Sequence, residues 1–270
     1  MNDDRYARYQ RLRFDRPFPG VLRVTLDSPL KMNAMDPTMH REISEVWADI
    51  ERDEETRAVL LTSAGRHFSA GGDMSGNPEE RGRFDVRMQV MKEARALVFG
   101  MLDCSRPIVC AARGWSVGAG LVCLLLSDIS IVARDARMSD GHVKIGVAAG
   151  DHAAIIWPLL CGMARAKYHL LLGEPFDGEQ AERMGMVSLA VDDGELDARA
   201  LALTQRLADG APFAIRATKR ALNSWLRLAA PTFESSLAME FLGFFGPEAA
   251  EGRAAFVEKR PPVFESRVPF

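Results

Sequence analysis

The chain has 270 residues, of which 47% are hydrophobic and 26% charged, and its formal net charge is −3. This composition excludes wholesale disorder and a fibrous repeat, and the chain is long enough to bury a sizeable core. The mild negative charge offers no long-range attraction for nucleic acid, so we expect no nucleic-acid partner.

Cysteine usage and the apolar runs predict a cytoplasmic protein. The four cysteines lie in or beside apolar runs without a CxxC pair, which favours buried thiols in a reducing compartment over disulfides or a metal site: Cys104, Cys110, Cys123 and Cys161. The arginine-rich start contains two early aspartates and lacks the apolar region of a signal peptide. The longest uncharged apolar run, VGAGLVCLLL, is about half the length that a bilayer requires, so no membrane partner is expected.

The first elements along the chain are a hairpin and a helix. Residues 9–15 and 20–27 alternate between apolar and polar positions on either side of RPFPG, which predicts a β-hairpin. Residues 35–54 have helical periodicity, with Asp36 as the N-cap and Pro37 at the first helical position.

The later elements predict an α/β fold. Residues 57–65, 106–114 and 128–135 form short, nearly continuous apolar runs, as expected for buried strands joined by helical crossovers. Beyond about residue 195 the periodicity is helical without strand signals. We therefore expect a core over residues 1–195 that carries the functional site, and a helical region over residues 196–270.

Two glycine-rich turns follow predicted strands, at residues 70–73 and 118–120. In the first, small side chains let backbone N–H groups approach a ligand closely. The second precedes an apolar helix, whose first N–H groups are unpaired and carry partial positive charge. Two such turns can converge on one carbonyl oxygen and stabilise the charge of an enolate or a tetrahedral intermediate. Either turn alone would more simply be a plain strand-to-helix connection, since a single glycine cluster is weak evidence for a site.

Several motifs together resemble the crotonase superfamily, the enoyl-CoA hydratase/isomerase group. They match its order and spacing over roughly residues 8 to 265, and they include RHFSAGGDM, RPIVCAARGWSVGAG, GEPFDGEQAERMGMVSLAV and EGRAAFVEKRPPVF. The resemblance implies a spiral of ββα units with a helical C-terminal region used in trimerisation, and usually a hexamer of two trimers. It also implies an acyl-CoA thioester as ligand, with no cofactor beyond the coenzyme A of the substrate.

The resemblance also assigns site residues by position. It implies that the N–H groups of Gly72 and Ala119 form the oxyanion hole. It implies contact with coenzyme A or the substrate for ten further residues: Lys31, Ala34, Ala70, Asp73, Met74, Gly118, Val122, Gly141, Phe256 and Lys259. Lys31 has support of its own as a cation for the phosphates, although a solvated surface lysine is an equally simple interpretation.

The chain departs from the hydratases of this group at both catalytic glutamates, whose positions hold Val122 and His142. Valine cannot transfer a proton, so hydration by two carboxylates is not available. His142 can take a proton from water near neutrality, and Asp151 is predicted to fold back and orient its ring. Alternatively, His142 is structural and Asp151 caps the following helix.

The remaining polar candidates have structural interpretations. Asp140 suits a turn, Asp128 a hydrogen bond at a strand entrance, and His67 local packing. His152 is a weaker alternative to His142, and Glu240 is expected at an exposed or subunit-interface position rather than in the site. Four aromatic residues pack in the core or line an acyl pocket: Phe84, Phe241, Phe244 and Phe245.

Three functions remain open from the sequence. The first is a lyase or isomerase of the enoyl-CoA hydratase/isomerase type, acting in fatty acid metabolism, with a thioester enolate in the oxyanion hole and His142 moving protons. The second is a β-diketone or acyl-CoA hydrolase that uses a water activated by His142 and Asp151. The third is a CoA-thioester-binding protein with little turnover, which Val122 keeps open. The acyl group itself is not predicted.

Overall fold

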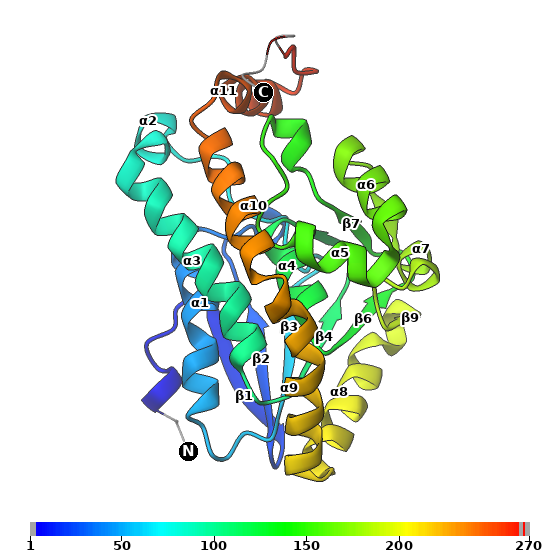
Figure 1. Cartoon of the computed structure of the whole chain (residues 1–270). Helices are drawn as coiled ribbons and strands as arrows, with labels where there is room; N and C mark the ends of the chain where they lie inside the picture. The colour runs from blue at the N-terminus through cyan, green and yellow to red at the C-terminus, as the bar shows by residue number, and fades with distance from the viewer. Residues whose placement is uncertain (1–3, 265–266, 268–270) are drawn as a thin grey trace.

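A computed structural model describes residues 4–264 and 267 (Figure 1). A six-stranded sheet in the order β1-β2-β3-β4-β6-β9 lies at its centre, and β1 and β2 are antiparallel while the later neighbours are parallel. The strands are β1 (Leu12–Phe18), β2 (Val21–Leu26), β3 (Ala58–Ser63), β4 (Ile108–Ala112), β6 (Ile129–Ala133) and β9 (Leu189–Val191).

The predicted hairpin and first helix are confirmed. The antiparallel pair β1–β2 is the hairpin. Helix α1 (Pro37–Glu51) begins where the sequence predicts, because the Asp36 side chain accepts a hydrogen bond from the N–H of Met39 and Pro37 occupies the first turn. Its buried face contains Trp47, which lies against Gly100, so burial of this apolar stripe holds the helix against the long helix over residues 84–103.

The fold is the α/β spiral of ββα units that the resemblance implies. Two successive turns of the spiral each add one strand to the large sheet and one to a small second sheet: β4 is followed by the strand over residues 115–117, and β6 by the strand over residues 137–139. The small sheet has the order β5-β7-β8 and consists of β5 (Trp115–Val117), β7 (Arg137–Ser139) and β8 (Phe176–Asp177). The sequence analysis missed these strands, since two or three residues are too few for a period-two pattern.

Helices surround the sheets. They are α2 (Pro78–Gly82), α3 (Phe84–Asp103), α4 (Ala119–Leu126), α5 (Ala153–Cys161), α6 (Met163–Leu172) and α7 (Gly178–Met184). The C-terminal part is helical as predicted, with α8 (Asp193–Asp209), α9 (Pro212–Leu228), α10 (Ala230–Gly243) and α11 (Pro247–Glu258). Short 3₁₀ helices are η1 (Asp4–Tyr6), η2 (Lys31–Asn33) and η3 (His142–Ile145).

The C-terminal helices pack on different parts of the core. Helix α8 covers the outer face of the large sheet, where Leu196 and Ala200 contact residues of β3 and β4. Helix α11 lies against η3 at the top of Figure 1, so closely that a Cβ on Gly252 would lie 2.4 Å from the backbone of Ile145. The division at residue 195 and a role of this region in oligomerisation stay predictions.

Several local predictions are also confirmed. Asp128 accepts a hydrogen bond from the N–H of Ile108, the first residue of β4, at 2.7 Å, and also holds the buried Lys219 ammonium at 2.8 Å. His67 accepts from the N–H of Trp115 at 3.2 Å, a local contact. The four cysteines are buried free thiols. No helix of the described chain combines the length and apolar character needed to cross a membrane.

Candidate active site

The glycine turn after β3 is held by hydrogen bonds to the segment that follows η2. Met35 donates to the carbonyl of Gly71 at 2.8 Å and accepts from the N–H of Asp73 at 2.9 Å. Because alternate residues of an extended segment turn their N–H groups to opposite sides, the N–H of Gly72 points away from Met35. Gly72 is exposed, and a Cβ there would meet nothing within 4 Å.

The same turn touches the start of α4. Ser69 pairs in parallel with residues 115–117, which brings the turn alongside the loop that leads into the helix. An added Cβ on Gly71 would lie 3.5 Å from the Cα of Gly118 and only 2.9 Å from the carbonyl oxygen of Val117, which is too close. Gly118 has φ 49° and ψ −126°, a conformation that glycine tolerates best, and Ala119 is the first residue of α4. The backbone contact therefore depends on glycine on both sides.

Two amide groups are free at this contact. Within residues 4–264 and 267, neither the N–H of Gly72 nor that of Ala119 has a hydrogen-bond acceptor. Each belongs to the residue directly after one of the two glycines that touch. The Ala119 group also carries the partial positive charge of a helix N-terminus. This arrangement suits the predicted binding of one carbonyl oxygen.

Two of the segments predicted to surround coenzyme A lie side by side. The N–H of Ala70 donates to the carbonyl of Met32 at 3.1 Å, which joins the glycine turn to η2, where Lys31 is exposed. The Asp73 carboxylate accepts hydrogen bonds from Ser75 and Arg81 and so shapes its own loop. Coenzyme A contacts stay predictions for all of the assigned positions: Lys31, Ala34, Ala70, Asp73, Met74, Gly118, Val122, Gly141, Phe256 and Lys259.

His142 lies at the start of η3, and Asp140 orients its ring. The Asp140 carboxylate Oδ1 accepts from the backbone N–H of His142 at 3.1 Å and lies 2.9 Å from Nδ1. Asp140 is only 1% exposed. A proton on Nδ1 therefore points at Asp140 and leaves Nε2 for the site. The prediction that Asp151 makes this orienting bond is wrong, because a partner two residues away in the same turn reaches the ring first.

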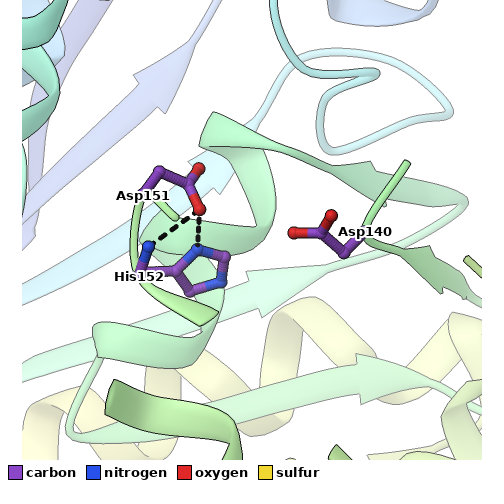
Figure 2. Close-up of side chains that lie close together, drawn as sticks. All are labelled: Asp140, Asp151 and His152. Carbon is purple, nitrogen blue, oxygen red and sulfur yellow. Dashed lines mark hydrogen bonds and ion pairs between the residues drawn. The ribbon is translucent and has the colours of Figure 1, made fainter. Parts of the chain in front are cut away.

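Asp151 instead forms a pair with its neighbour His152. Asp151 Oδ1 accepts from the backbone N–H of His152 at 2.8 Å and lies 2.6 Å from its Nδ1 (Figure 2). Asp151 does not cap α5, and Figure 2 shows the Asp140 carboxylate turned towards this pair. His152 is fully buried, and its Nε2 accepts from the Trp157 indole at 3.4 Å. The pair therefore fixes the Asp151 carboxylate at the edge of the site.

Glu240, on α10, completes the cluster from the other side. It is only 4% exposed, which corrects the prediction of an exposed or interface position. One carboxylate oxygen accepts from the N–H of Gly150 at 3.1 Å, and the other lies 3.6 Å from Nε2 of His142. The signal in the sequence was an acid on an otherwise apolar helix face. Such a residue is either exposed or buried with partners, and here the partners lie 90 residues away in the chain.

Burial and mutual attraction set the charges of this cluster. Burial favours the neutral ring of His142, but the carboxylates of Asp140 and Glu240 outweigh it and raise the pKa of His142 well above 6.5. Burial, with Asp151 and Asp140 nearby, raises the pKa of Glu240 to about 8. The pKa of Asp151 is lowered, because His152 and His142 outweigh its burial. The resting site therefore holds a protonated His142 beside an ionised Asp151, rather than a ring that titrates near neutrality.

Ligand atoms in the cluster have spacings that a metal ion could bridge. Atoms of Asp140, Asp151 and His152 lie within 4.8 Å of one another, and so do atoms of His142, Asp151 and Glu240. The short carboxylate–imidazole contacts of both pairs already compensate charge there. One oxygen, Oδ2 of Asp140, is buried and has no hydrogen-bond partner among the described residues. The expectation of no bound metal stays a prediction.

Comparison with known proteins identifies the family. The enoyl-CoA hydratase/isomerase model matches residues 18–267. The 1,2-epoxyphenylacetyl-CoA isomerase of Escherichia coli is 34% identical over 92% of this chain and 96% of its own length. The (E)-benzylidenesuccinyl-CoA hydratase of Thauera aromatica is 31% identical over 90% of this chain and 95% of its own.

Solved structures agree with this match. An enoyl-CoA hydratase/isomerase from Mycobacterium paratuberculosis superposes with a TM-score of 0.85 at 29% identity, covering 90% of this chain and 97% of that one. The chain therefore belongs to the enoyl-CoA hydratase/isomerase family of the crotonase superfamily, whose members act on acyl-CoA thioesters. That Val122 and His142 stand at the two glutamate positions of the family stays a prediction.

The loop contact predicts the effect of a side chain at Gly71, where φ is +80° and a Cβ would lie 2.9 Å from the carbonyl oxygen of Val117. Gly71→Ala should displace the Gly72 amide and reduce kcat/KM about a hundredfold or more, as loss of one oxyanion donor does. Steady-state kinetics on an active thioester measures this. Gly65→Ala is the matched control, because its φ is +79° but a Cβ meets nothing within 4 Å. An equal loss of kcat/KM in Gly71→Ala and Gly65→Ala would contradict a specific role of the loop contact.

The charge of Glu240 predicts how stability depends on pH. Its pKa rises from 4.5 to about 8 on folding, so between these values the folded protein keeps a proton that the unfolded chain has lost. Stability from this group therefore falls as pH rises, by about 1 kcal/mol per pH unit. Urea unfolding between about pH 5 and 8 should show a flatter decline in Glu240→Gln. Glu234→Gln, an exposed acid on α10, should keep the wild-type slope. A wild-type slope in Glu240→Gln would contradict the buried-acid assignment.

Proposed function

We propose that the chain is an acyl-CoA isomerase of this family that stabilises a thioester enolate at Gly72 and Ala119 and moves protons through His142, Asp151 and Glu240. The observation that carries the proposal is the cluster of these three side chains, whose ligand atoms lie within 4.8 Å of one another. The resemblance assigns His142 to the position of one family glutamate. Val122, at the other glutamate position, is 2% exposed and cannot hold a water. Proton transfer is therefore proposed from one side of the substrate only.

Each proton-transfer step fits the charge of a residue. With the thioester oxygen between the two amides, the ionised Asp151 takes a proton from the acyl chain, and the C–H electron pair becomes the enolate double bond while the oxygen takes up charge. The protonated His142 then delivers a proton to the γ-carbon, and the carbonyl re-forms. The proton on Asp151 returns to His142 within the cluster, which restores the resting charges and shifts a double bond.

A hydrolase of β-diketones is the second candidate, and one observation favours it. Asp140 and His142 are hydrogen-bonded as a carboxylate–imidazole dyad, and the 3.6 Å between Nε2 and Glu240 is too long for a direct hydrogen bond. A bridging water could attack a ligand carbonyl once Nε2 is deprotonated, and an enolate would then leave into the same oxyanion hole. This reaction would release a cleaved carboxylic acid, which separates it from isomerisation.

Apolar surface on α9 supports the predicted trimer or hexamer. Phe213, Leu222, Trp225 and Leu228 are exposed on this helix. Beside them a cavity of about 620 Å³ is lined by residues of α4, α5 and α9, away from the site. Contiguous exposed apolar surface marks protein–protein contacts. Sedimentation equilibrium measures the mass directly: a trimer or hexamer supports the assembly, and a monomer contradicts it.

Exchange of acyl α-protons tests enolate formation apart from the later steps. Butyryl-CoA incubated with the protein in D₂O should gain deuterium, which mass spectrometry measures, because enolisation needs no conjugated double bond. Asp151→Asn should lower this rate about a hundredfold or more, since it removes the base. His142→Ala should lower isomerisation of 3-enoyl-CoA thioesters about as much, while thioester binding remains.

The controls separate the three functions. Lys144→Ala, an exposed side chain on η3, should leave both rates unchanged. Exchange at the wild-type rate in Asp151→Asn would remove that residue as the base. Thioester binding without exchange or isomerisation in the wild type would favour a protein with little turnover, and a cleaved β-diketone product would favour the hydrolase.

A further inference from the structure

Arg87 carries a half-buried positive charge without a partner. It lies in the first turn of α3, and within residues 4–264 and 267 its guanidinium makes no hydrogen bond and no ion pair. The Nε atom is buried, and the guanidinium carbon lies 4.1 Å from the centre of the Phe244 ring. A guanidinium has five N–H donors, and leaving the buried Nε–H unpaired away from water is costly. The stacking fixes the guanidinium in one place without satisfying this donor.

Two further arginines make the surroundings of Arg87 positive. Burial, followed by repulsion from Arg81 and Arg253, lowers the pKa of Arg87. Arg81 is paired with Asp73 at 3.1 Å, whereas Arg253, on α11, donates to the backbone carbonyls of Met74 and Gly76 and so keeps its charge uncompensated. Helices α2 and α3 and the C-terminal α11 therefore bring together a local excess of positive charge.

The acid that attracts Arg87 does not pair with it. Among the described residues Glu240 makes no ion pair with Arg87, and its two carboxyl oxygens lie instead against the N–H of Gly150 and against Nε2 of His142. The same contact places Arg87 beside the reacting groups. Phe244, on which Arg87 is stacked, lies one helical turn beyond Glu240, and its N–H donates to the Glu240 carbonyl at 3.2 Å. Glu240 in turn lies 3.6 Å from His142.

The arginine cluster, formed by Arg81, Arg87 and Arg253, also reaches the glycine turn that contains Gly72. Asp73, the partner of Arg81, directly follows Gly72. Through Phe244 on one side and Arg81 on the other, Arg87 is thus linked to the residues proposed to hold the acyl chain. The predicted phosphate partner, Lys31, lies on η2, a different element from the arginine cluster. The position of Arg87 thus suits an anion on the acyl group better than the phosphates of coenzyme A.

We propose that Arg87 binds a carboxylate at the far end of the acyl group, so that the substrates of this site are dicarboxylic acyl-CoA thioesters. This inference rests on the proposed function, since it requires an acyl-CoA ligand. A carboxylate matches the fork of N–H donors in a guanidinium with two parallel hydrogen bonds, which also fixes the direction of the acyl chain. Such a substrate supplies the negatively charged partner that Arg87 lacks among the described residues.

Matched pairs of saturated thioesters test the inference by binding. Isothermal titration compares succinyl-, glutaryl- and adipyl-CoA with butyryl-, valeryl- and hexanoyl-CoA, and free coenzyme A is measured alongside. The wild type should bind at least one dicarboxylic thioester about tenfold to a hundredfold more tightly than its monocarboxylic match. Arg87→Gln should reduce this preference to less than about threefold, with the monocarboxylic thioesters and free coenzyme A unaffected.

A second arginine on the same helix provides the control. Arg95 is also stacked on a phenylalanine, Phe99, but is exposed and paired with Glu234, so Arg95→Gln should keep the preference. Arg87→Lys should keep part of it, because the charge remains and the fork is lost. Circular dichroism of each variant shows whether it is folded.

Each outcome has a distinct meaning. The absence of a carboxylate preference in the wild type, or its persistence in Arg87→Gln, overturns the inference while the proposed function stands. Equal weakening of free coenzyme A and all thioesters in Arg87→Gln also overturns it, because Arg87 would then bind the phosphates. Failure of every thioester and of free coenzyme A to bind the wild type refutes the proposed function itself.

Discussion

The site depends on one short backbone segment being held between two others. Residues 69–73 pair with Met35 on one side and with residues 115–117 on the other, which leaves the Gly72 amide free beside the first amide of α4. These contacts are backbone to backbone, so they need small residues at the crossing rather than particular side chains. In the proposed reaction, two donors fixed in this way would stabilise developing charge without reorganising, which is what the proton transfers of the cluster require.

The charged cluster gathers its titratable groups around His142, and Val122 is buried and apolar. If these two residues stand at the glutamate positions of the family, as the resemblance implies, one cluster replaces the acids that a glutamate pair would place on two sides of a ligand. Ion pairing compensates part of the free-energy cost of burying these charged groups. The part that is not compensated raises the pKa of Glu240. The cluster thus combines a protonated His142 and a protonated Glu240, which can donate protons, with an ionised Asp151, which can accept one. A single imidazole would not provide both.

Local signals in the sequence were sufficient for much of the fold. Asp36 and Pro37 mark the start of α1, and the alternating runs mark the hairpin, because these patterns act over a few residues. The site was only partly predictable. The amides of Gly72 and Ala119 follow from glycine-rich turns and the resemblance, but the partner of His142 does not, since either nearby aspartate could have reached it. The buried position of Glu240 depends on packing of α10 against residues distant in the chain, which no local pattern reports.

Polarisation of the bound thioester is the most direct test of the central claim that the two amides act on one oxygen. Infrared difference spectra with a ¹³C-labelled thioester carbonyl isolate the stretch of that bond in the complex. The account predicts a shift to lower frequency on binding, and a smaller shift in Gly71→Ala than in the wild type. A bound thioester whose carbonyl stretch stays at its solution frequency would contradict the claim.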